Sequence, residues 1–222
     1  MGIVKVGHRG VGEGLNENTI CAVKKAIDVG MDMVELDVRL TKDRVPVIIH
    51  DDVIEGDLKV SELTWGEIRK LQLPECSRIP SLAEMLDFVK GRIGLVLDIK
   101  EGKCEEEIVG ALKRYVEDVL IIVASFDATL LMGIKAMLPQ IKVALMSVGV
   151  EKEVIQEIAS VFDALFVYLP FVGRDIVEEV HRVGCMVFAW VADTVDDLMY
   201  AVKVGVDGVV INNTSVLVEG VV

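Results

Sequence analysis

Long apolar runs, paired cysteines and positive charge are all scarce in this sequence of 222 residues. The longest uncharged apolar stretch, residues 164–173, is far shorter than the roughly 18 apolar residues that a membrane-spanning helix needs. Lys and Arg number 23 against 36 Asp and Glu, for a net charge of −13. Nucleic acids and anionic membranes attract clustered basic residues, so we expect no nucleic-acid partner and no membrane insertion. A small phosphorylated substrate needs only local positive charge and is not excluded.

The few cysteines are widely scattered, and no Cys-x-x-Cys pair is present, so the sequence predicts neither a zinc site nor a redox motif. We expect four reduced thiols in a cytoplasmic protein, at Cys21, Cys76, Cys104 and Cys185. We also expect no signal peptide, because residues 1–6 lead directly into a strand pattern. The sequence does not indicate an oligomeric state.

What the chain does have is hydrophobic residues, at 52%, arranged as short runs that alternate with amphipathic stretches. Short apolar runs of this kind are typical of parallel strands that are buried on both faces. We expect strands near 3–7, 33–38, 94–99, 119–124, 141–146, 163–168, 186–191 and 207–211. We expect helices near 18–29, 81–90, 104–116, 127–137, 150–161, 172–183, 194–204 and 213–219.

Such βα repeats predict a parallel sheet with right-handed crossovers, and eight of them in one chain predict an α/β fold, a closed (β/α)8 TIM-type barrel. We expect a single domain over residues 1–222, with a doubly wound open sheet as the alternative. A ninth apolar run, residues 45–49, follows the second strand too closely for a parallel crossover. It must turn back through residues 42–44 as a hairpin. Residues of about 42–80 then form an excursion over the barrel mouth, with an extra helix near 65–72.

The second strand carries the most informative pattern, because Glu35 and Asp37 interrupt an apolar stretch two residues apart. Side chains at that spacing point to the same face of a strand. Two carboxylates held together on an apolar strand repel each other, so a cation should lie between them. All-oxygen ligands suit Mg²⁺, Ca²⁺ or Mn²⁺. The alternative is an edge strand whose polar face meets water.

The other strand ends add further polar side chains at the same mouth. The first strand is followed by His8 and Arg9, and the hairpin by His50 and Asp51. Two histidines that face one site are suited to general acid and general base catalysis. His181 instead falls in the last turn of a barrel helix, at the opposite end, where a cation complements the helix dipole. We expect it to be structural.

The third strand places Asp98 and Lys100 on one face, again two residues apart. Lys100 either donates to an anionic oxygen or forms a simple ion pair with Asp98. Arg9 offers a planar pair of donors for phosphate, or a salt bridge to a barrel carboxylate. Trp190, at the end of the seventh strand, is either a core aromatic or a wall that packs on the alcohol portion of a substrate.

Taken in order, these motifs resemble the glycerophosphodiester phosphodiesterase family over essentially the whole chain. No single motif is specific, but the combination is. The motifs are His8-Arg9-Gly10, Glu17-Asn18-Thr19, Glu35-Leu36-Asp37, His50-Asp51, Ile79-Pro80-Ser81-Leu82, Ile99-Lys100, Ser125-Phe126 and Gly205-Val206-Asp207-Gly208.

The resemblance implies a (β/α)8 barrel that uses a divalent metal to hydrolyse glycerophosphodiesters, small-molecule substrates, to glycerol 3-phosphate and an alcohol. It implies that the substrate's own 2-hydroxyl attacks phosphorus first, giving a cyclic phosphate that water then opens. It implies His8 and His50 as the acid/base pair and Glu35, Asp37 and Asp98 as metal ligands. It also implies Arg9, Lys100 and Trp190 as substrate contacts, and Glu17, Asn18 and Asp51 as supporting residues.

The sequence departs from the family pattern at several positions. The third-strand ligand is usually Glu and here is Asp98. The family has an arginine shortly after His-Asp, and the short acidic segment 53–57 lacks it. The family's Trp-Thr-Val-Asn signature is replaced by Trp-Val-Ala-Asp at residues 190–193. The family's closing Thr-Asp is replaced by Ile-Asn at residues 211–212. Headgroup preference and efficiency are therefore open. Two alternative functions remain: a phospholipase-like relative that stops at a cyclic phosphate, and a catalytically silent barrel that binds a phosphorylated ligand.

Overall fold

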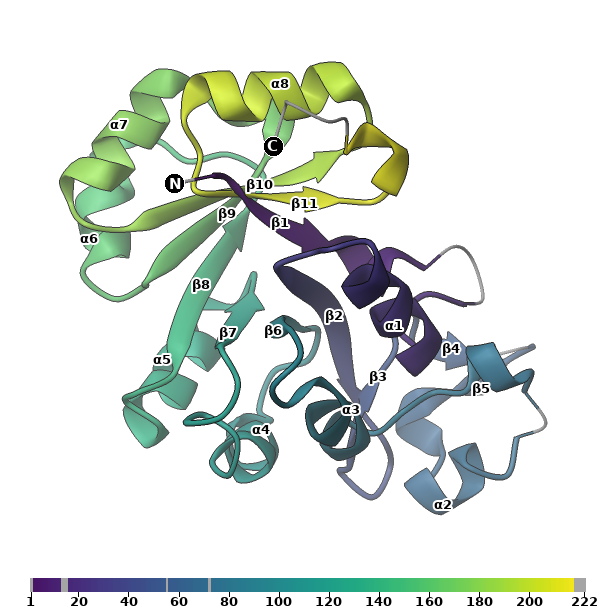
Figure 1. The fold of residues 1–222 in the computed structure, drawn as a ribbon. Helices are drawn as coiled ribbons and strands as arrows, with labels where there is room; N and C mark the ends of the chain where they lie inside the picture. The colour runs from purple at the N-terminus through teal and green to yellow at the C-terminus, as the bar shows by residue number, and fades with distance from the viewer. Residues whose placement is uncertain (1, 13–15, 55, 72, 218–222) are drawn as a thin grey trace.

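The computed structural model describes residues 2–12, 16–54, 56–71 and 73–217, and its centre is a barrel of parallel strands (Figure 1). The strands pair in the order β1, β2, β6, β7, β8, β9, β10 and β11, and β1 pairs with both β2 and β11. This pairing closes the sheet, so the predicted (β/α)8 barrel is confirmed and the open sheet is excluded. The barrel strands are β1 (Val4–Gly7), β2 (Met33–Leu40), β6 (Gly94–Ile99), β7 (Ile121–Ser125), β8 (Lys142–Ser147), β9 (Ala164–Tyr168), β10 (Met186–Ala192) and β11 (Gly208–Ile211).

Helices lie around the outside of the barrel and connect its strands (Figure 1). Capping boxes stabilise several of their N-termini: Ser81 forms one with Glu84, and Thr194 forms one with Asp197. Gly30, Gly184 and Gly205 have positive φ angles just after helices. The helices are α1 (Ile20–Asp28), α2 (Trp65–Ile68), α3 (Leu82–Val89), α4 (Glu105–Leu112), α5 (Ala128–Met137), α6 (Ile155–Ala159), α7 (Arg174–Arg182) and α8 (Val195–Val204).

Four expected helices are shorter than the sequence pattern predicts. The stretch 104–116 is helical only over α4, which ends at Leu112. The stretch 150–161 contains the 3-10 helix η5 (Lys152–Val154) followed by α6, and the excursion helix is the single turn α2. In the described part of the stretch 213–219, which ends at residue 217, the structure has the 3-10 helix η7 (Thr214–Val216), and Asn213 caps this turn. Residues 218 and 219 of that expected helix lie outside the described residues.

Two apolar clusters pack against the outer and the inner face of the barrel strands. The larger cluster fills the layer between the strands and the surrounding helices and includes Leu36, Leu97 and Leu131. The smaller cluster fills the barrel interior, where the rings of Phe166 and Phe188 stack with centroids 4.7 Å apart. Both faces of the strands are therefore apolar, as the short hydrophobic runs indicated. A buried charged side chain on these strands needs a specific reason.

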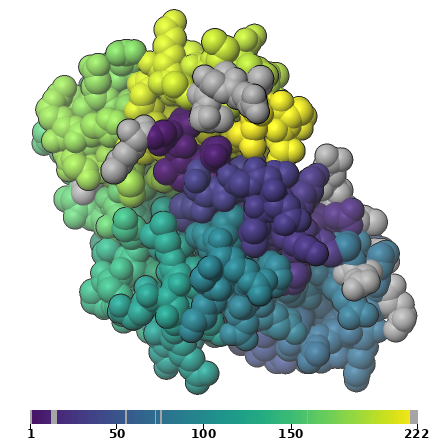
Figure 2. Space-filling view, in the orientation of Figure 1, coloured from purple at the N-terminus to yellow at the C-terminus, as the bar shows by residue number. Residues whose placement is uncertain are grey.

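The segment after β2 turns back as predicted. Strand β3 (Pro46–Ile48) pairs antiparallel with β2, and Arg39 lies opposite Val47. The excursion that follows packs to one side of the barrel, next to α1 and α3, and its blue atoms form one edge of the molecule (Figures 1 and 2). It contains β4 (Val53–Ile54), β5 (Leu58–Lys59), η3 (Val60–Glu62), α2 and η4 (Glu75–Ser77). Of the short acidic segment noted above, Glu55 lies outside the described residues.

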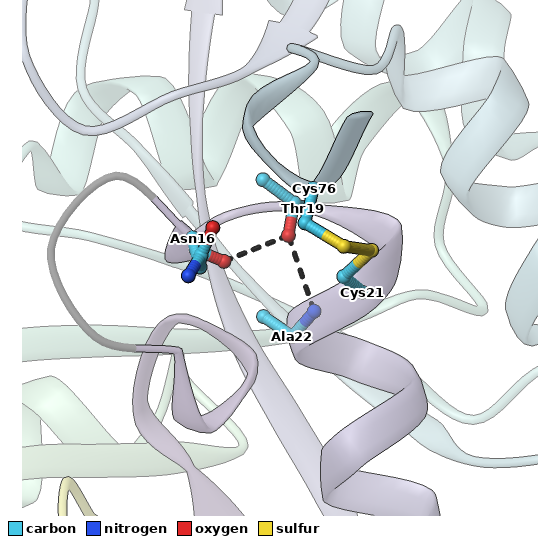
Figure 3. The surroundings of a disulfide bond; sticks show 5 residues. All are labelled: Asn16, Thr19, Cys21, Ala22 and Cys76. Carbon is cyan, nitrogen blue, oxygen red and sulfur yellow. Dashed lines mark hydrogen bonds between the residues drawn. A yellow bond between two sulfur atoms is a disulfide. The ribbon is translucent and has the colours of Figure 1, made fainter. Parts of the chain in front are cut away.

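A disulfide bond joins the excursion to the barrel wall. Cys21, in the first turn of α1, is bonded to Cys76 in η4, 55 positions later in the sequence (Figure 3). The prediction of four reduced thiols is therefore wrong for this pair, because the excursion folds back onto α1 and brings the two side chains together. The prediction is confirmed for Cys104 and Cys185, which are free and buried. Burial raises the pKa of Cys104 to about 12 and the pKa of Cys185 to about 11.

The disulfide also affects the expectation of a cytoplasmic protein. Disulfides persist mainly in oxidising compartments, although some intracellular proteins of hyperthermophiles contain them. The scattered cysteines therefore no longer support that location, which stays a prediction. In the described part of the chain, every helix is too short or too polar to cross a membrane.

Candidate active site

Three carboxylates meet on the inner face of two neighbouring strands. Glu35 and Asp37 come from β2, and Asp98 comes from β6, where it lies directly opposite Asp37 in the strand register. All three side chains are buried, and one oxygen from each lies within 4.8 Å of the others. The parity argument from the sequence therefore predicted the cluster correctly, and the polar edge-strand interpretation is wrong.

The electrostatics of the cluster are unfavourable for three negative charges. Burial raises the pKa of Glu35 well above its usual range, and the charges of Asp37 and Asp98 add to this effect. Burial also raises the pKa of Asp98, against the opposing charge of Lys100. Burial acts in the same direction on Asp37, but there the charge and hydrogen bond of Lys100, with help from Asn18 and Arg9, lower the pKa below its usual value.

Asn18 holds Asp37 in place from both sides. The Asn18 amide nitrogen donates to Oδ2 of Asp37 over 2.7 Å, and its amide oxygen accepts from the Asp37 backbone nitrogen over 3.0 Å. Asn18 reaches this position with a positive φ of 57°, an angle that Asn tolerates better than most residues. Asn18 therefore positions a member of the carboxylate cluster, consistent with its expected supporting role.

Arg9 connects the loop after β1 to the same cluster. Its backbone nitrogen donates to Oε2 of Glu35 over 3.0 Å, and its guanidinium contacts Glu17 over 2.6 Å and Asp37 over 3.4 Å. The loop approaches α1 closely at Gly10, where φ is +77° and an added Cβ would lie 3.0 Å from the backbone nitrogen of Val23. Arg9 thus makes the carboxylate salt bridge that the sequence left open as an alternative to phosphate binding.

Lys100 lies between the two aspartates. Its ammonium is 2.8 Å from Oδ1 of Asp37 and also contacts Oδ2 of Asp98. Burial would lower the pKa of Lys100, but the charges of Asp37 and Asp98 raise it, so the side chain is a cation. Here too the ion pair considered from the sequence is present, and it involves two carboxylates rather than one.

The residues present fit a hard divalent cation. Oδ1 of Asp98 is buried without a hydrogen-bond partner among the described residues, although a buried carboxylate oxygen is normally satisfied. A cation held by Glu35, Asp37 and Asp98 would satisfy this oxygen and offset the repulsion that raises the pKa of Glu35. Glu101 is not part of the cluster; its carboxylate lies 3.6 Å from the guanidinium of Arg39.

His8 stands at the edge of the carboxylate cluster, directly after β1. Its Nε2 is 3.8 Å from Oε2 of Glu35, and its Nδ1 is 2.9 Å from Oδ1 of Asn212. When Nδ1–H donates to Asn212, Nε2 keeps its lone pair and faces the cluster. Burial lowers the pKa of His8; the Asn212 hydrogen bond opposes this shift, and the charge of Arg9 adds to it.

His50 approaches the mouth from the hairpin that follows β3. Its Nδ1 is 2.8 Å from Oδ1 of Asp51, and its backbone carbonyl accepts a hydrogen bond from Arg39 over 2.7 Å. A positive charge on His50 acts to lower the pKa of Asp98, although burial, the largest cause, raises it. His50 and Asp51 also line a cavity of about 140 Å³, together with Glu17 and Asn18. Asp51, whose side chain is well exposed, orients the imidazole.

Trp190 belongs to a group of aromatic rings at the ends of β7, β9 and β10. Its indole nitrogen donates to the carbonyl of Phe166 over 3.2 Å, and its ring centroid is 5.0 Å from Tyr168 and 6.1 Å from Phe126. The ring is half-buried and packs on the barrel-interior cluster, while Phe126 and Tyr168 are exposed. Trp190 is therefore partly a core residue and partly a surface of the mouth.

Asn212 is the site residue that the sequence reasoning did not identify. It was noted only as a departure from the Thr-Asp ending of the family pattern. It directly follows β11, whose residue Ile211 pairs with Gly7, so Asn212 and His8 extend neighbouring strands. The rule that barrel sites gather at C-terminal strand ends would have identified it.

The hydrogen bond with Asn212 acts to raise the pKa of His8 against the larger effect of burial, which leads to a prediction. Replacing Asn212 with Asp would put a carboxylate against Nδ1 and favour the imidazolium, so the pKa of His8 should rise. An NMR titration of the imidazole resonances of the metal-free protein would measure this change. The His8 midpoint should move to higher pH in Asn212→Asp. An unchanged His8 midpoint would show that the contact with Asn212 is not made in solution.

The comparisons with known proteins agree with this geometry. Residues 8–216 match the model of the glycerophosphoryl diester phosphodiesterase family. The chain belongs to this family. It is 31% identical to a glycerophosphodiester phosphodiesterase of Caldanaerobacter subterraneus subsp. tengcongensis over 236 aligned positions, which cover 96% of each chain. The class of enzyme that the motifs implied, a glycerophosphodiester phosphodiesterase, is confirmed.

Solved structures of family members share the fold. A phosphodiesterase of Oleispira antarctica in complex with sn-glycerol-3-phosphate superposes with a TM-score of 0.83 at 23% identity, covering 96% of this chain and 94% of that one. A glycerophosphodiester phosphodiesterase of Parabacteroides distasonis has a TM-score of 0.83 at 21% identity, covering 95% and 92%. At these identities the similarity supports the barrel itself.

Proposed function

We propose that this family member hydrolyses glycerophosphodiesters to glycerol 3-phosphate and an alcohol, with a divalent cation and two histidines. The observation that carries the proposal is the buried cluster of Glu35, Asp37 and Asp98 with His8 beside it. The product complex of the Oleispira antarctica relative supports glycerol 3-phosphate as the product. The relevant partner is thus a small molecule, while the headgroup and the physiological cation stay open.

The three carboxylates would hold the cation, and Mg²⁺, Ca²⁺ and Mn²⁺ all suit their oxygens. A bound cation would neutralise the cluster and polarise the phosphoryl oxygens of the substrate. Arg9 and Lys100 keep positive charge beside the carboxylates, and this charge would attract the phosphate of the substrate. Glu17 and Asn18 fix Arg9 and Asp37, and Trp190 offers an apolar surface to the substrate.

His8 is suited to act as the general base. Its lowered pKa keeps the imidazole neutral near neutral pH, and the bond to Asn212 leaves Nε2 free to accept a proton. We assign to it the proton of the substrate's 2-hydroxyl, whose oxygen attacks phosphorus. His50, oriented by Asp51, gives its proton to the leaving alcohol as the P–O bond to that alcohol breaks. The result is a cyclic phosphate and the free alcohol.

The second half of the reaction reverses these proton transfers. Water loses a proton to His50 as its oxygen attacks the cyclic phosphate, and His8 returns its proton to the departing 2-oxygen. Glycerol 3-phosphate is formed, and both histidines regain their starting states. A relative that lacked this second half would accumulate the cyclic phosphate, as the phospholipase-like alternative requires.

Product analysis tests the proposal. The protein would be incubated with glycerophosphocholine, glycerophosphoethanolamine and glycerophosphoglycerol, and phosphorus NMR would follow the products with and without chelator. We expect glycerol 3-phosphate to accumulate from at least one substrate, and chelator to stop its formation. A cyclic phosphate as the final product would support the lyase alternative. Unchanged substrate at every headgroup would support a silent binding barrel.

Asp98 provides a test of the ligand set, because it is one methylene shorter than the usual Glu. That methylene is worth about 1.5 Å of reach. We expect Asp98→Asn to weaken cation affinity about tenfold or more, and Asp98→Glu to keep activity. Glu101→Gln is the matched control, since Glu101 pairs with Arg39 outside the cluster. Isothermal titration of the three variants with Mn²⁺ measures this. Lost affinity in Glu101→Gln with normal affinity in Asp98→Asn would show that the third ligand is misassigned.

A further inference from the structure

A second cavity lies outside the barrel mouth, where the excursion packs against the barrel. It has a volume of about 590 Å³, which is in the range of small-molecule pockets. Its walls come from three parts of the chain: the start of α1, the α2 region and the segment that leads into α3. Most of the lining residues are apolar, among them Trp65, Ile68, Leu71 and Phe88, while polar atoms make up about half of the exposed lining surface.

Positive charge gathers around this apolar cavity in a chain whose net charge is −13. Arg69 and Arg78 both line it, and neither side chain forms an ion pair or hydrogen bond with any residue that the structure describes. The Arg69 guanidinium lies 5.9 Å from the Trp65 ring centroid, and the Arg92 guanidinium lies 4.7 Å from that of Phe88. Two of the aromatic rings in the lining therefore have a guanidinium group over them, although Asp and Glu far outnumber Lys and Arg in the whole sequence.

Among the described residues, the one acidic side chain in the lining is already engaged. Oε2 of Glu84 accepts hydrogen bonds from the backbone nitrogen and the hydroxyl of Ser81, over 2.9 and 3.0 Å, in the capping box of α3. Glu84 therefore stabilises a helix N-terminus and does not neutralise the two arginines. The unpaired charge beside the cavity is positive.

The cavity is separate from the proposed catalytic site. Its lining contains neither of the two catalytic histidines and none of the three clustered carboxylates. Leu73 and Ile79 line both this cavity and the smaller one beside His50, so these two side chains form the wall between them. Cys21 also lines the larger cavity, and its disulfide bond to Cys76 joins the excursion to α1 beside this cavity.

We propose that this cavity is a binding site for an anionic amphiphile: a ligand with an apolar body and one carboxylate, phosphate or sulfate group. The apolar body would lie against Trp65, Ile68, Leu71 and Phe88, and the acidic group would be held by Arg69 and Arg78 at the rim. Guanidinium groups without acidic partners bind such oxyanions through paired hydrogen bonds. A cationic ligand would not pair with the two arginines, and a purely polar ligand would not cover the apolar walls.

Isothermal titration calorimetry on the whole chain tests this inference with decanoate as the probe. Decanoate should bind with a stoichiometry of one, and decyltrimethylammonium, which has the same tail and the opposite charge, should not. The double variant Arg69→Ala/Arg78→Ala should lose affinity for decanoate about tenfold or more. Arg114→Ala, another exposed arginine, is the matched control and should bind as the unmodified chain does.

Competition separates this site from the catalytic one. A saturating concentration of glycerol 3-phosphate should leave the decanoate affinity unchanged, and so should His50→Ala. Equal binding of the cationic and anionic amphiphiles would overturn the proposal, as would full affinity in the double arginine variant or displacement by glycerol 3-phosphate. Because the readout is binding rather than turnover, its outcome is independent of the proposed hydrolysis.

Discussion

His8→Ala and His50→Ala are each expected to lower kcat by at least about a hundredfold, within the ~10²- to 10⁴-fold range that general acid/base groups supply. His8 presents Nε2 to the carboxylate cluster, and His50 is oriented by Asp51 after the hairpin. Neither imidazole is part of the apolar core, so the fold should remain intact. Steady-state kinetics with the preferred glycerophosphodiester, together with circular dichroism of each variant, would measure both points.

The third histidine is the matched control for this experiment. His181 lies in the last turn of α7, and its Nε2 is 2.8 Å from Oδ2 of Asp207, just before β11. This position is at the N-terminal end of the barrel strands, away from the mouth, where the sequence predicted His181 to lie. His181→Ala should therefore retain activity within a few-fold of the unmodified enzyme. A loss as large as that of His8→Ala would show that the mouth has been assigned wrongly.

Removal of divalent cations is expected to abolish activity, and Mg²⁺, Mn²⁺ or Ca²⁺ should restore it. The physical reason is that burial, together with the charges of Asp37 and Asp98, raises the pKa of Glu35. Oδ1 of Asp98 is also buried without a hydrogen-bond partner among the described residues. Lys100 offsets the charge of only two of these groups by direct contact. The measurement is the rate of glycerol 3-phosphate release after dialysis against chelator, followed by titration with each cation.

The same titration has an internal check. Glu35→Gln removes one charge from the cluster and one oxyanion from the ligand set, so it should raise the cation concentration needed for half-maximal activity. Full turnover by the dialysed enzyme, with no cation detected by elemental analysis, would show that no divalent cation is required.

The barrel and the core of the site could be predicted because both depend on local patterns. Two-residue spacing fixed the common face of Glu35 and Asp37 and of Asp98 and Lys100, and the strand register then brought Asp37 beside Asp98. The hairpin followed from a connection too short for a parallel crossover. Both arguments need only strand geometry and chain length.

The remaining contacts depend on how distant segments pack, which a single sequence does not determine. Arg9 and Lys100 were recognised as site cations, but only the fold shows that carboxylates take up their donors. The bond between Cys21 and Cys76 required knowing where the excursion folds back. The contact of His8 with Asn212 links the first and last strands of the barrel, 204 positions apart in sequence.

The most direct test of the central claim is an anomalous diffraction measurement on crystals equilibrated with Mn²⁺. The account predicts one anomalous peak per chain among the carboxylates of Glu35, Asp37 and Asp98, with the Lys100 ammonium moved away from one or both aspartates. An anomalous map without a peak at this cluster, with Lys100 still joined to Asp37 and Asp98, would contradict the account.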